Sequence, residues 1–257
     1  MTLASLDDAR IELAAALRLA ARFDLHEGID NHFSYSLSDG TFLVNRWGVH
    51  WSRMTARDIL QVDSTGIVQR GRGTVERTAF AIHSRVHLAR PHARAILHTH
   101  MPYATALACT NARIEPISQN SLRFQGRVAY DDSYRGVAND PTEGERIAAA
   151  LGANSILVMR HHGVLVTGHT IGLAFDDLYF FERTARIQLL ARASGYPLVP
   201  ISPEIIDTTV RQIGKLDADR QTHFEVLKAL LLEEAPSYAD LDGEPNRSVA
   251  DEDGTVP

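Results

Sequence analysis

Residues 95–104 read AILHTHMPYA, an apolar run that ends in two histidines, His98 and His100. Alternate side chains of a β-strand point to the same face, so a strand here would place both imidazoles together. Pro102 suits the first turn of a following helix. The stretch therefore predicts a short strand that carries two neighbouring imidazoles and leads into a helix.

A second apolar run, residues 155–160, ends at His161, His162 and Gly163. A single histidine on a strand is more often a hydrogen-bonded core or surface group than a metal ligand. Imidazoles at the ends of two predicted strands, with positions left for water or substrate, are instead typical of a catalytic divalent-metal site. The glycine would let the backbone approach closely there.

Composition narrows the class of protein. The 257 residues are 44% hydrophobic, enough for one large core or two small ones. A formal charge of −6 gives no reason to expect nucleic acid or an anionic membrane as a partner. The single cysteine, Cys109, excludes an internal disulfide and fits a reducing compartment. The first residues carry acids where a signal peptide carries bases, so we expect a cytoplasmic protein.

Lysine is scarce, because Lys215 and Lys228 are the only lysines in the sequence. Both lie late in the chain, in a region with a plain helical pattern. A Schiff-base mechanism needs a lysine in a pocket, so this chemistry is disfavoured. Any activation of a carbonyl or carboxylate must come from another group.

Strands and helices alternate along the chain, which predicts an α/β protein. Residues 1–233 form the predicted domain, and the acidic, turn-rich residues 234–257 form a tail that is mobile or packed on a neighbouring subunit. We expect helices at 6–24, 75–90 and 170–193, a single helix at 203–233, a hairpin at 33–44, and strands at 59–63 and 127–130.

Two features of the predicted helix at 75–90 allow more than one interpretation. His83 and His87 are four residues apart, but a helical two-histidine metal motif usually has an acid beside the first histidine, where Ser84 stands. We interpret the pair as packing, as support for the site or as a subunit contact. Glu76 is either an ordinary acid of the first helical turn or an acid/base of the site.

Taken together, several segments resemble the class II aldolase/adducin family: RPHARAILHTHMPYATAL, HHGVLV, and the earlier NHFS, DGTFLVNRWGVHW and MTARDILQVD. The resemblance extends from about residue 8 to 195. It implies a three-layer α/β/α fold around a mixed, mostly antiparallel sheet, in a homotetramer with active sites between subunits. It also implies one divalent ion per subunit on His98, His100 and His162, with His161 as a neighbour; we expect zinc or manganese, with iron as an alternative.

The sequence departs from the sugar-phosphate aldolases of this family. Those carry a Ser-Ser-Glu motif whose glutamate is the acid/base, and Ala79 stands at the equivalent place. Glu76 lies one helical turn earlier, Arg77-Thr78 replaces the serines, and Trp47 stands where a small polar residue is usual. A phosphorylated substrate is therefore disfavoured. The pattern resembles more closely the branch with decarboxylases of hydroxylated aromatic or pyridine acids.

From this resemblance we expect a metal-dependent carbon–carbon lyase that decarboxylates a hydroxy- or keto-acid through an enolate. Arginines would grip the carboxylate with paired hydrogen bonds. Turn and sheet packing explain Gln119, Asn120 and Tyr130 equally well. The alternatives are retro-aldol cleavage, an iron-dependent oxygenase and an adducin-like assembly protein without catalysis. The candidate substrate-binding residues are Asn31, His32, Trp47, Gly48, Arg53, Gln119 and Asn120, and the candidate catalytic residues are Glu76, Arg77, Tyr130 and His161.

Overall fold

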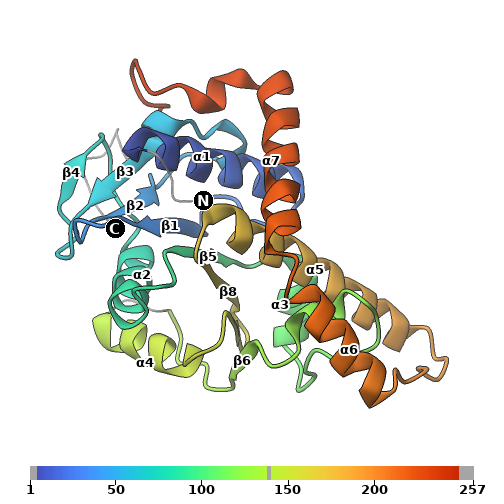
Figure 1. Cartoon of the computed structure of the whole chain (residues 1–257). Coiled ribbons are helices and arrows are strands. Elements are labelled where there is room, and N and C mark those ends of the chain that lie inside the picture. Colours follow the sequence, from blue (N-terminus) through green and yellow to red (C-terminus); the bar gives the residue numbers. More distant parts are fainter. Residues whose placement is uncertain (1–4, 138–139, 249–257) are drawn as a thin grey trace.

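The computed structural model describes residues 5–137 and 140–248. Within these ranges a sheet of eight strands lies between two layers of helices (Figure 1), which confirms the three-layer α/β/α fold. The strands are β1 (His32–Ser36), β2 (Phe42–Asn45), β3 (Ile59–Val62), β4 (Val68–Arg70), β5 (Ala95–Thr99), β6 (Val128–Asp131), β7 (Ile156–Met159) and β8 (Gly163–Gly168). The helices are α1 (Leu6–Arg22), α2 (Arg77–Ala89), α3 (Pro102–Ala108), α4 (Pro141–Leu151), α5 (Ile171–Ala193), α6 (Pro203–Ile213) and α7 (Asp217–Glu234).

The strand order is β4-β3-β2-β1-β5-β8-β7-β6, and β6–β7 is the one parallel pair among the described strands. The sheet is therefore mixed and mostly antiparallel, as expected. In the register of the central strands, His32 of β1 lies opposite His98 of β5, and Thr99 of β5 lies opposite Val164 of β8. This pairing brings the end of β5 beside the start of β8.

The alternation of side chains along β5 divides the core into two. Leu97 packs in the larger cluster with α1, α3 and α5, whereas Ile96 packs with α2 and α4 on the other face. His98 follows the alternation of Ile96 and so lies on the α2 side of the sheet.

Two expectations about the elements were wrong or incomplete. Residues 163–168, which we did not predict as a strand, form β8 in the centre of the sheet. The single helix predicted at 203–233 is two helices, because α6 ends at Ile213 with Gly214 as its C-cap, and α7 begins after Leu216. None of the helices in the described ranges is both long enough and apolar enough to cross a membrane.

The described part of the predicted tail packs against its own chain. In residues 240–248, which we call the C-terminal strap, the backbone N–H of Asn246 donates to the buried carboxylate of Asp58 over 2.8 Å. The Asn246 carbonyl accepts from Arg46 at 2.7 Å, and the hydroxyl of Ser248 donates to the Trp47 carbonyl at 2.9 Å. Residues 249–257 of the predicted tail lie outside the described residues. The domain boundary at residue 233 stays a prediction.

Candidate metal centre

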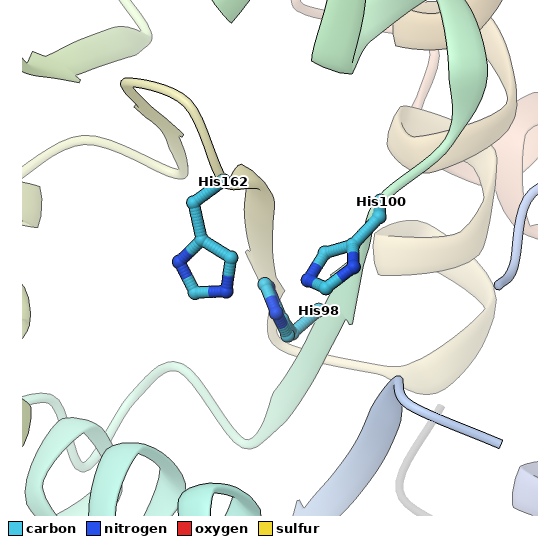
Figure 2. Close-up of side chains that lie close together, drawn as sticks. All are labelled: His98, His100 and His162. Atoms are coloured by element: carbon cyan, nitrogen blue, oxygen red, sulfur yellow. The ribbon is translucent and has the colours of Figure 1, made fainter. Parts of the chain in front are cut away.

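The two predicted strand ends meet. His98 is in β5, His100 follows it, and His162 lies in the turn between β7 and β8; their rings face one another (Figure 2). The ring centroids are 4.8–5.0 Å apart. One nitrogen from each ring lies within 4.8 Å of a nitrogen of each other ring. We call these three residues the histidine triad.

The turn that carries His162 depends on close backbone packing. A Cβ on Gly163 would lie 2.4 Å from the Thr99 carbonyl oxygen and 2.9 Å from the His100 ring, so a larger residue would push the two strand ends apart. His161 takes a positive φ of 56°, which is uncommon for a residue with a side chain. The turn directs the exposed His161 outward, where its ring lies against Tyr134 with the ring centroids 6.0 Å apart.

Hydrogen bonds at the second nitrogen of two rings leave the first nitrogen for an ion. Nδ1 of His98 lies 2.9 Å from the Val164 carbonyl, which only accepts, so this nitrogen carries the proton. Nδ1 of His100 lies 3.1 Å from a Glu27 carboxylate oxygen. Among the described residues, the buried Nε2 of His100 has no hydrogen-bond partner. Such an orphaned nitrogen, beside two other imidazoles, fits a divalent metal ion.

Two imidazoles of the triad, those of His98 and His162, are held in the neutral form that metal binding requires. Burial lowers the pKa of His162 to about 4, with a further contribution from the neighbouring His100. Burial likewise holds the pKa of His98 well below its usual range, and the surrounding histidines add to the effect. Neutral imidazoles with free lone pairs at pH 7 are ready ligands.

Two of the predicted substrate-binding residues lie beside the triad. The buried Asn31 accepts from the backbone N–H of Glu27 at 2.7 Å and of His100 at 3.4 Å, so it fixes the chain on both sides of the Glu27–His100 contact. The ring of His32 lies against that of His98, with the centroids 4.7 Å apart.

The predicted residues between 47 and 77 have other contacts. The half-buried Trp47 donates its backbone N–H to Thr74, and Gly48 takes the left-handed backbone that its turn requires, with φ of 81°. Arg53 is exposed and binds the C-terminal strap through its carbonyl. Glu76 caps α2 by accepting from the backbone N–H of Ala79 at 2.8 Å. Arg77, the next residue, is exposed.

The last three predicted residues lie elsewhere. Gln119 and Asn120 line a separate pocket of about 290 Å³, whose walls come from α5 and the α6–α7 region and do not include the triad. The hydroxyl of Tyr130 accepts from the backbone of Ile114 at 2.8 Å, and its ring packs with the core on the α5 side of the sheet. His98 is on the opposite face. The catalytic or binding roles of these residues stay predictions.

Two carboxylates that support the triad were missed by sequence reasoning. Glu27 hydrogen-bonds His100, and Glu182 of α5 accepts from the first backbone N–H groups of α3, those of Tyr103 and Ala104, both at 2.8 Å. Helix α3 begins directly after the strand end that carries His100. Neither acid belongs to a motif with recognisable spacing, so only the folded chain reveals them.

Comparison with known proteins adds relatives to this geometry. The family model of the class II aldolase and adducin N-terminal domain matches residues 11–189. A putative aldolase class 2 protein of Caulobacter vibrioides is 33% identical over 80% of this chain and 81% of its own length. The decarboxylase NovR of Streptomyces niveus is 29% identical over 68% of this chain and 64% of its own length. A Streptomyces roseochromogenus protein named 4-hydroxy-3-prenylphenylpyruvate oxygenase/4-hydroxy-3-prenylbenzoate synthase is 30% identical over 68% of this chain and 63% of its own length.

Solved structures agree with the fold. An aldolase II superfamily protein from Pseudomonas syringae superposes with a TM-score of 0.85 at 33% identity, covering 91% of this chain and 96% of its own. The L-fuculose 1-phosphate aldolase of Glaciozyma antarctica superposes with a TM-score of 0.78 at 28% identity, covering 91% and 95%. The family model matches most of this chain, residues 11–189, and the histidine triad is in place. The chain therefore belongs to the class II aldolase and adducin N-terminal domain family.

Proposed function

We propose that the protein is a divalent-metal-dependent carbon–carbon lyase that decarboxylates a hydroxy- or keto-acid without a phosphate group. The observation that carries the proposal is the triad, three imidazoles that converge with one orphaned buried nitrogen. His98, His100 and His162 would hold the ion, zinc or manganese ahead of iron. When bound, such an ion supplies Lewis acidity that lowers the energy of an enolate next to it.

The position of the lysines supports metal chemistry over a Schiff base. Lys228 lies on α7 and pairs with Glu12 and Glu225, and the exposed Lys215 lies between α6 and α7. A Schiff-base lysine must be unprotonated in a pocket. The ion pairs instead raise the pKa of Lys228, although its burial opposes them.

The proposed reaction breaks the bond between the carboxylate and the neighbouring carbon. Carbon dioxide leaves, the electron pair passes to the adjacent carbonyl as an enolate, and an acid then returns a proton to carbon. Arg53 and Arg77, both exposed, are proposed to bind the substrate carboxylate. His161, Glu76 and Tyr130 are the proposed proton donors, and Tyr130 ranks last because its ring packs on the opposite face of the sheet from His98. Glu76 already uses its carboxylate to cap α2, so we rank His161 ahead of it.

A decarboxylase is favoured over a sugar-phosphate aldolase by one position. Ala79, where the resemblance implies the aldolase acid, is buried in the first turn of α2 and has no titratable side chain. The relative named decarboxylase NovR adds support. The solved L-fuculose 1-phosphate aldolase keeps retro-aldol cleavage as the first alternative.

The test is release of carbon dioxide from a panel of aromatic hydroxy-acids and 3-keto-acids, with the protein loaded in turn with Zn²⁺, Mn²⁺ and Fe²⁺. We expect at least one acid to be decarboxylated by wild type and by the control His92→Ala, which changes an exposed histidine, and not by His98→Ala. Aldehyde release from a hydroxy-acid or sugar phosphate, without carbon dioxide, would replace the decarboxylase with the aldolase.

An oxygenase is the second candidate, favoured by the oxygenase in the name of one relative. Three histidines with open positions also suit iron(II) and oxygen. Oxygen uptake that accompanies turnover only in the iron-loaded protein would select this function. A folded protein that takes up no metal would instead favour the adducin-like assembly role.

We also propose a cytoplasmic homotetramer with sites between subunits, acting on a small acid and binding neither nucleic acid nor membrane. Exposed apolar side chains on and after α5 support self-association: Leu190 is 56%, Tyr196 is 81% and Val199 is 84% exposed. Light scattering coupled to gel filtration would measure the subunit number, and a monomer would contradict the proposal.

A further inference from the structure

The pocket of about 290 Å³ that contains Gln119 and Asn120 is separate from the metal centre. Its walls come from the short 3₁₀ helix η3 (Ser121–Phe124) and the residues before it, from the first half of α5, and from the junction of α6 and α7. Helix α5 covers the face of the sheet opposite His98. A ligand in this pocket would therefore not contact the triad.

A buried carboxylate forms the floor of the pocket. Asp176 is 1% exposed, and its Oδ2 accepts from Arg123 and, at 3.0 Å, from Nε of Arg220. Its Oδ1 lies 2.9 Å from Nδ1 of His223. Both oxygens of Asp176 are thus engaged, so the floor offers no free carboxylate to a cation.

The two arginines of the floor differ in how far their donors are used. Arg220 uses all three guanidinium nitrogens in ion pairs with acids: Asp176, Asp177 and Asp217. Arg123 pairs through Nη2 alone, and among the described residues its Nε and Nη1 have no hydrogen-bond partner. A guanidinium has five N–H donors, so three of those of Arg123 are left for a ligand. The side chain is only 15% exposed, which makes an acceptor for them valuable.

The charges around the floor leave a positive excess. Three guanidinium groups face two buried carboxylates there: Arg123, Arg127 and Arg220 against Asp176 and Asp177. The further acids Asp217 and Asp219 are exposed, and water and salt screen their charge. One negative charge placed at Arg123 would balance the excess.

The rest of the wall is apolar or uncharged: Phe180, Ile213, Leu216, Gln119 and Asn120. The guanidinium of Arg123 covers one face of the Phe180 ring, 4.0 Å from its centroid, so the cation borders the apolar surface directly. Among the described residues, the two side-chain amides have no hydrogen-bond partner. Apolar walls with a few polar groups that converge are typical of a small-molecule site.

We propose that this pocket binds a small organic carboxylate with a flat apolar body, and that its carboxylate accepts from the free N–H groups of Arg123. The amides of Gln119 and Asn120 donate to the same end of the ligand, and its body packs against Ile213 and Leu216. The volume lies at the lower end of the usual range for ligand pockets, which favours a single ring. Gln119 and Asn120 then bind a ligand away from the metal centre.

Equilibrium dialysis of benzoate with the metal-free, full-length protein tests the proposal. The His98→Ala protein is the background, so that no ion in the triad can hold the acid. Benzamide, which has the same shape without the charge, is the matched ligand. We expect saturable binding of benzoate at a single site and binding of benzamide at least about tenfold weaker. No saturable binding of benzoate below about 10 mM, or equal binding of the two ligands, would overturn the proposal.

Two variants on the same background place the bound acid in this pocket. Arg123→Gln removes the cation, and Ile213→Trp fills the apolar part while leaving every ion pair in place. Each should weaken benzoate binding by about 10–100-fold. The control is Arg183→Gln, because Arg183 covers the ring of Tyr179 at 3.8 Å but does not line the pocket. Unchanged binding in Ile213→Trp, or in a folded Arg123→Gln protein, would overturn the proposal.

The ion pairs that remain should keep the first variant folded, because Asp176 still contacts Arg220 and His223. If Arg123→Gln does not fold, Ile213→Trp decides the outcome alone. The dialysis needs neither metal nor turnover. Binding of benzoate would therefore stand if no lyase activity were found, and the lyase could equally survive the absence of binding.

Discussion

At the scale of single residues, the metal centre depends on the second nitrogen of its imidazoles. Nδ1 of His98 bonds a backbone carbonyl, and Nδ1 of His100 bonds the carboxylate of Glu27. A carboxylate that accepts from a ligand histidine orients the ring and makes its free nitrogen more basic. Glu27 is itself exposed, so its contribution is one of orientation.

We predict that Glu27→Ala weakens metal binding by about 10–100-fold, the range found for such supporting partners. Glu27→Gln keeps an acceptor and should lose less. Competition with a chromophoric chelator measures the dissociation constant, and Asp30→Ala, at a neighbouring exposed acid, is the control. Equal metal affinity in Glu27→Ala and wild type would show that Glu27 does not support the metal centre.

The buried histidines predict how stability changes with pH. An unfolded histidine has a pKa of about 6.5, whereas that of His162 is lowered to about 4 and those of His32 and His87 to about 3. The unfolded chain therefore binds more protons below pH 6.5. Stability is full above that pH and falls as pH drops, on the order of 1.4 kcal/mol per pH unit for each histidine.

Urea unfolding of the metal-free protein at pH 7.5, 5.5 and 4.5 measures this change. His92→Gln and His169→Gln, which replace exposed histidines, should follow the wild-type profile. A free energy of unfolding that stays constant from pH 7.5 to 4.5 would contradict the neutral, buried imidazoles.

Sequence reasoning at this scale located the two strand ends from the spacing of their histidines, and the family resemblance chose His162 rather than His161. It named His32 as a binding residue and left the role of His83 open. It could not find Glu27, since the contact with His100 spans 73 positions of sequence and belongs to no motif. Contacts of this kind come from the strand pairing that the fold sets.

At the scale of elements, helix α3 fixes the chain directly after His100. Pro102 occupies its first turn, as the sequence predicted, and Glu182 from α5 accepts two backbone N–H groups there. A helix leaves its first N–H groups without intrahelical partners, so a carboxylate at this end is stabilising. Helix α5 therefore fixes the segment that follows strand β5 and carries His100.

We predict that Glu182→Ala lowers the free energy of unfolding by about 1–3 kcal/mol, because one buried and one partly buried N–H group lose their acceptor. Urea denaturation measures the loss. Glu204→Ala, at an exposed acid in the first turn of α6, should change stability by less than about 0.5 kcal/mol. A Glu182→Ala protein as stable as this control would contradict the capping role.

The C-terminal strap gives a second prediction at this scale. Asn246 bonds Asp58 through both its backbone and its side chain, and Asp58 is fully buried. Asn246→Ala removes the side-chain bonds to Asp58 and to the Arg53 carbonyl, so the strap should be cleaved faster by a nonspecific protease. The exposed Asp242→Ala is the control, and equal cleavage rates would show that Asn246 does not anchor the strap.

The elements that sequence reasoning missed have identifiable causes. Strand β8, to which we assigned no element from the sequence, begins and ends with glycine and follows the histidine turn. Its pairing with β5 and β7 makes it a strand. The apolar spacing of α6 continues towards α7, which suggested one helix. Gly214 at the end of α6 interrupts it, and no residue of α6 is buried to hold the two in line.

At the scale of the whole molecule, the antiparallel order of the central strands creates the centre. The end of β5 and the start of β8 are neighbours. Residues about sixty positions apart in sequence therefore meet where these two inner strands end and begin. The helices α2 and α4 cover the face of the sheet that carries His98, and the hydrogen-bonded His32 and His83 lie between β1 and α2. The fold class followed from alternating elements and the family resemblance, whereas the strand order required the structure.

The central claim is that the triad holds one divalent ion per subunit. Elemental analysis of protein purified without added metal or chelator, beside His98→Ala, His162→Ala and the control His92→Ala, tests it most directly. We predict about one equivalent of a divalent metal in wild type and in the control, and its loss in both triad variants. A folded wild-type protein that neither contains a metal nor takes one up, or triad variants that keep it, would contradict the claim.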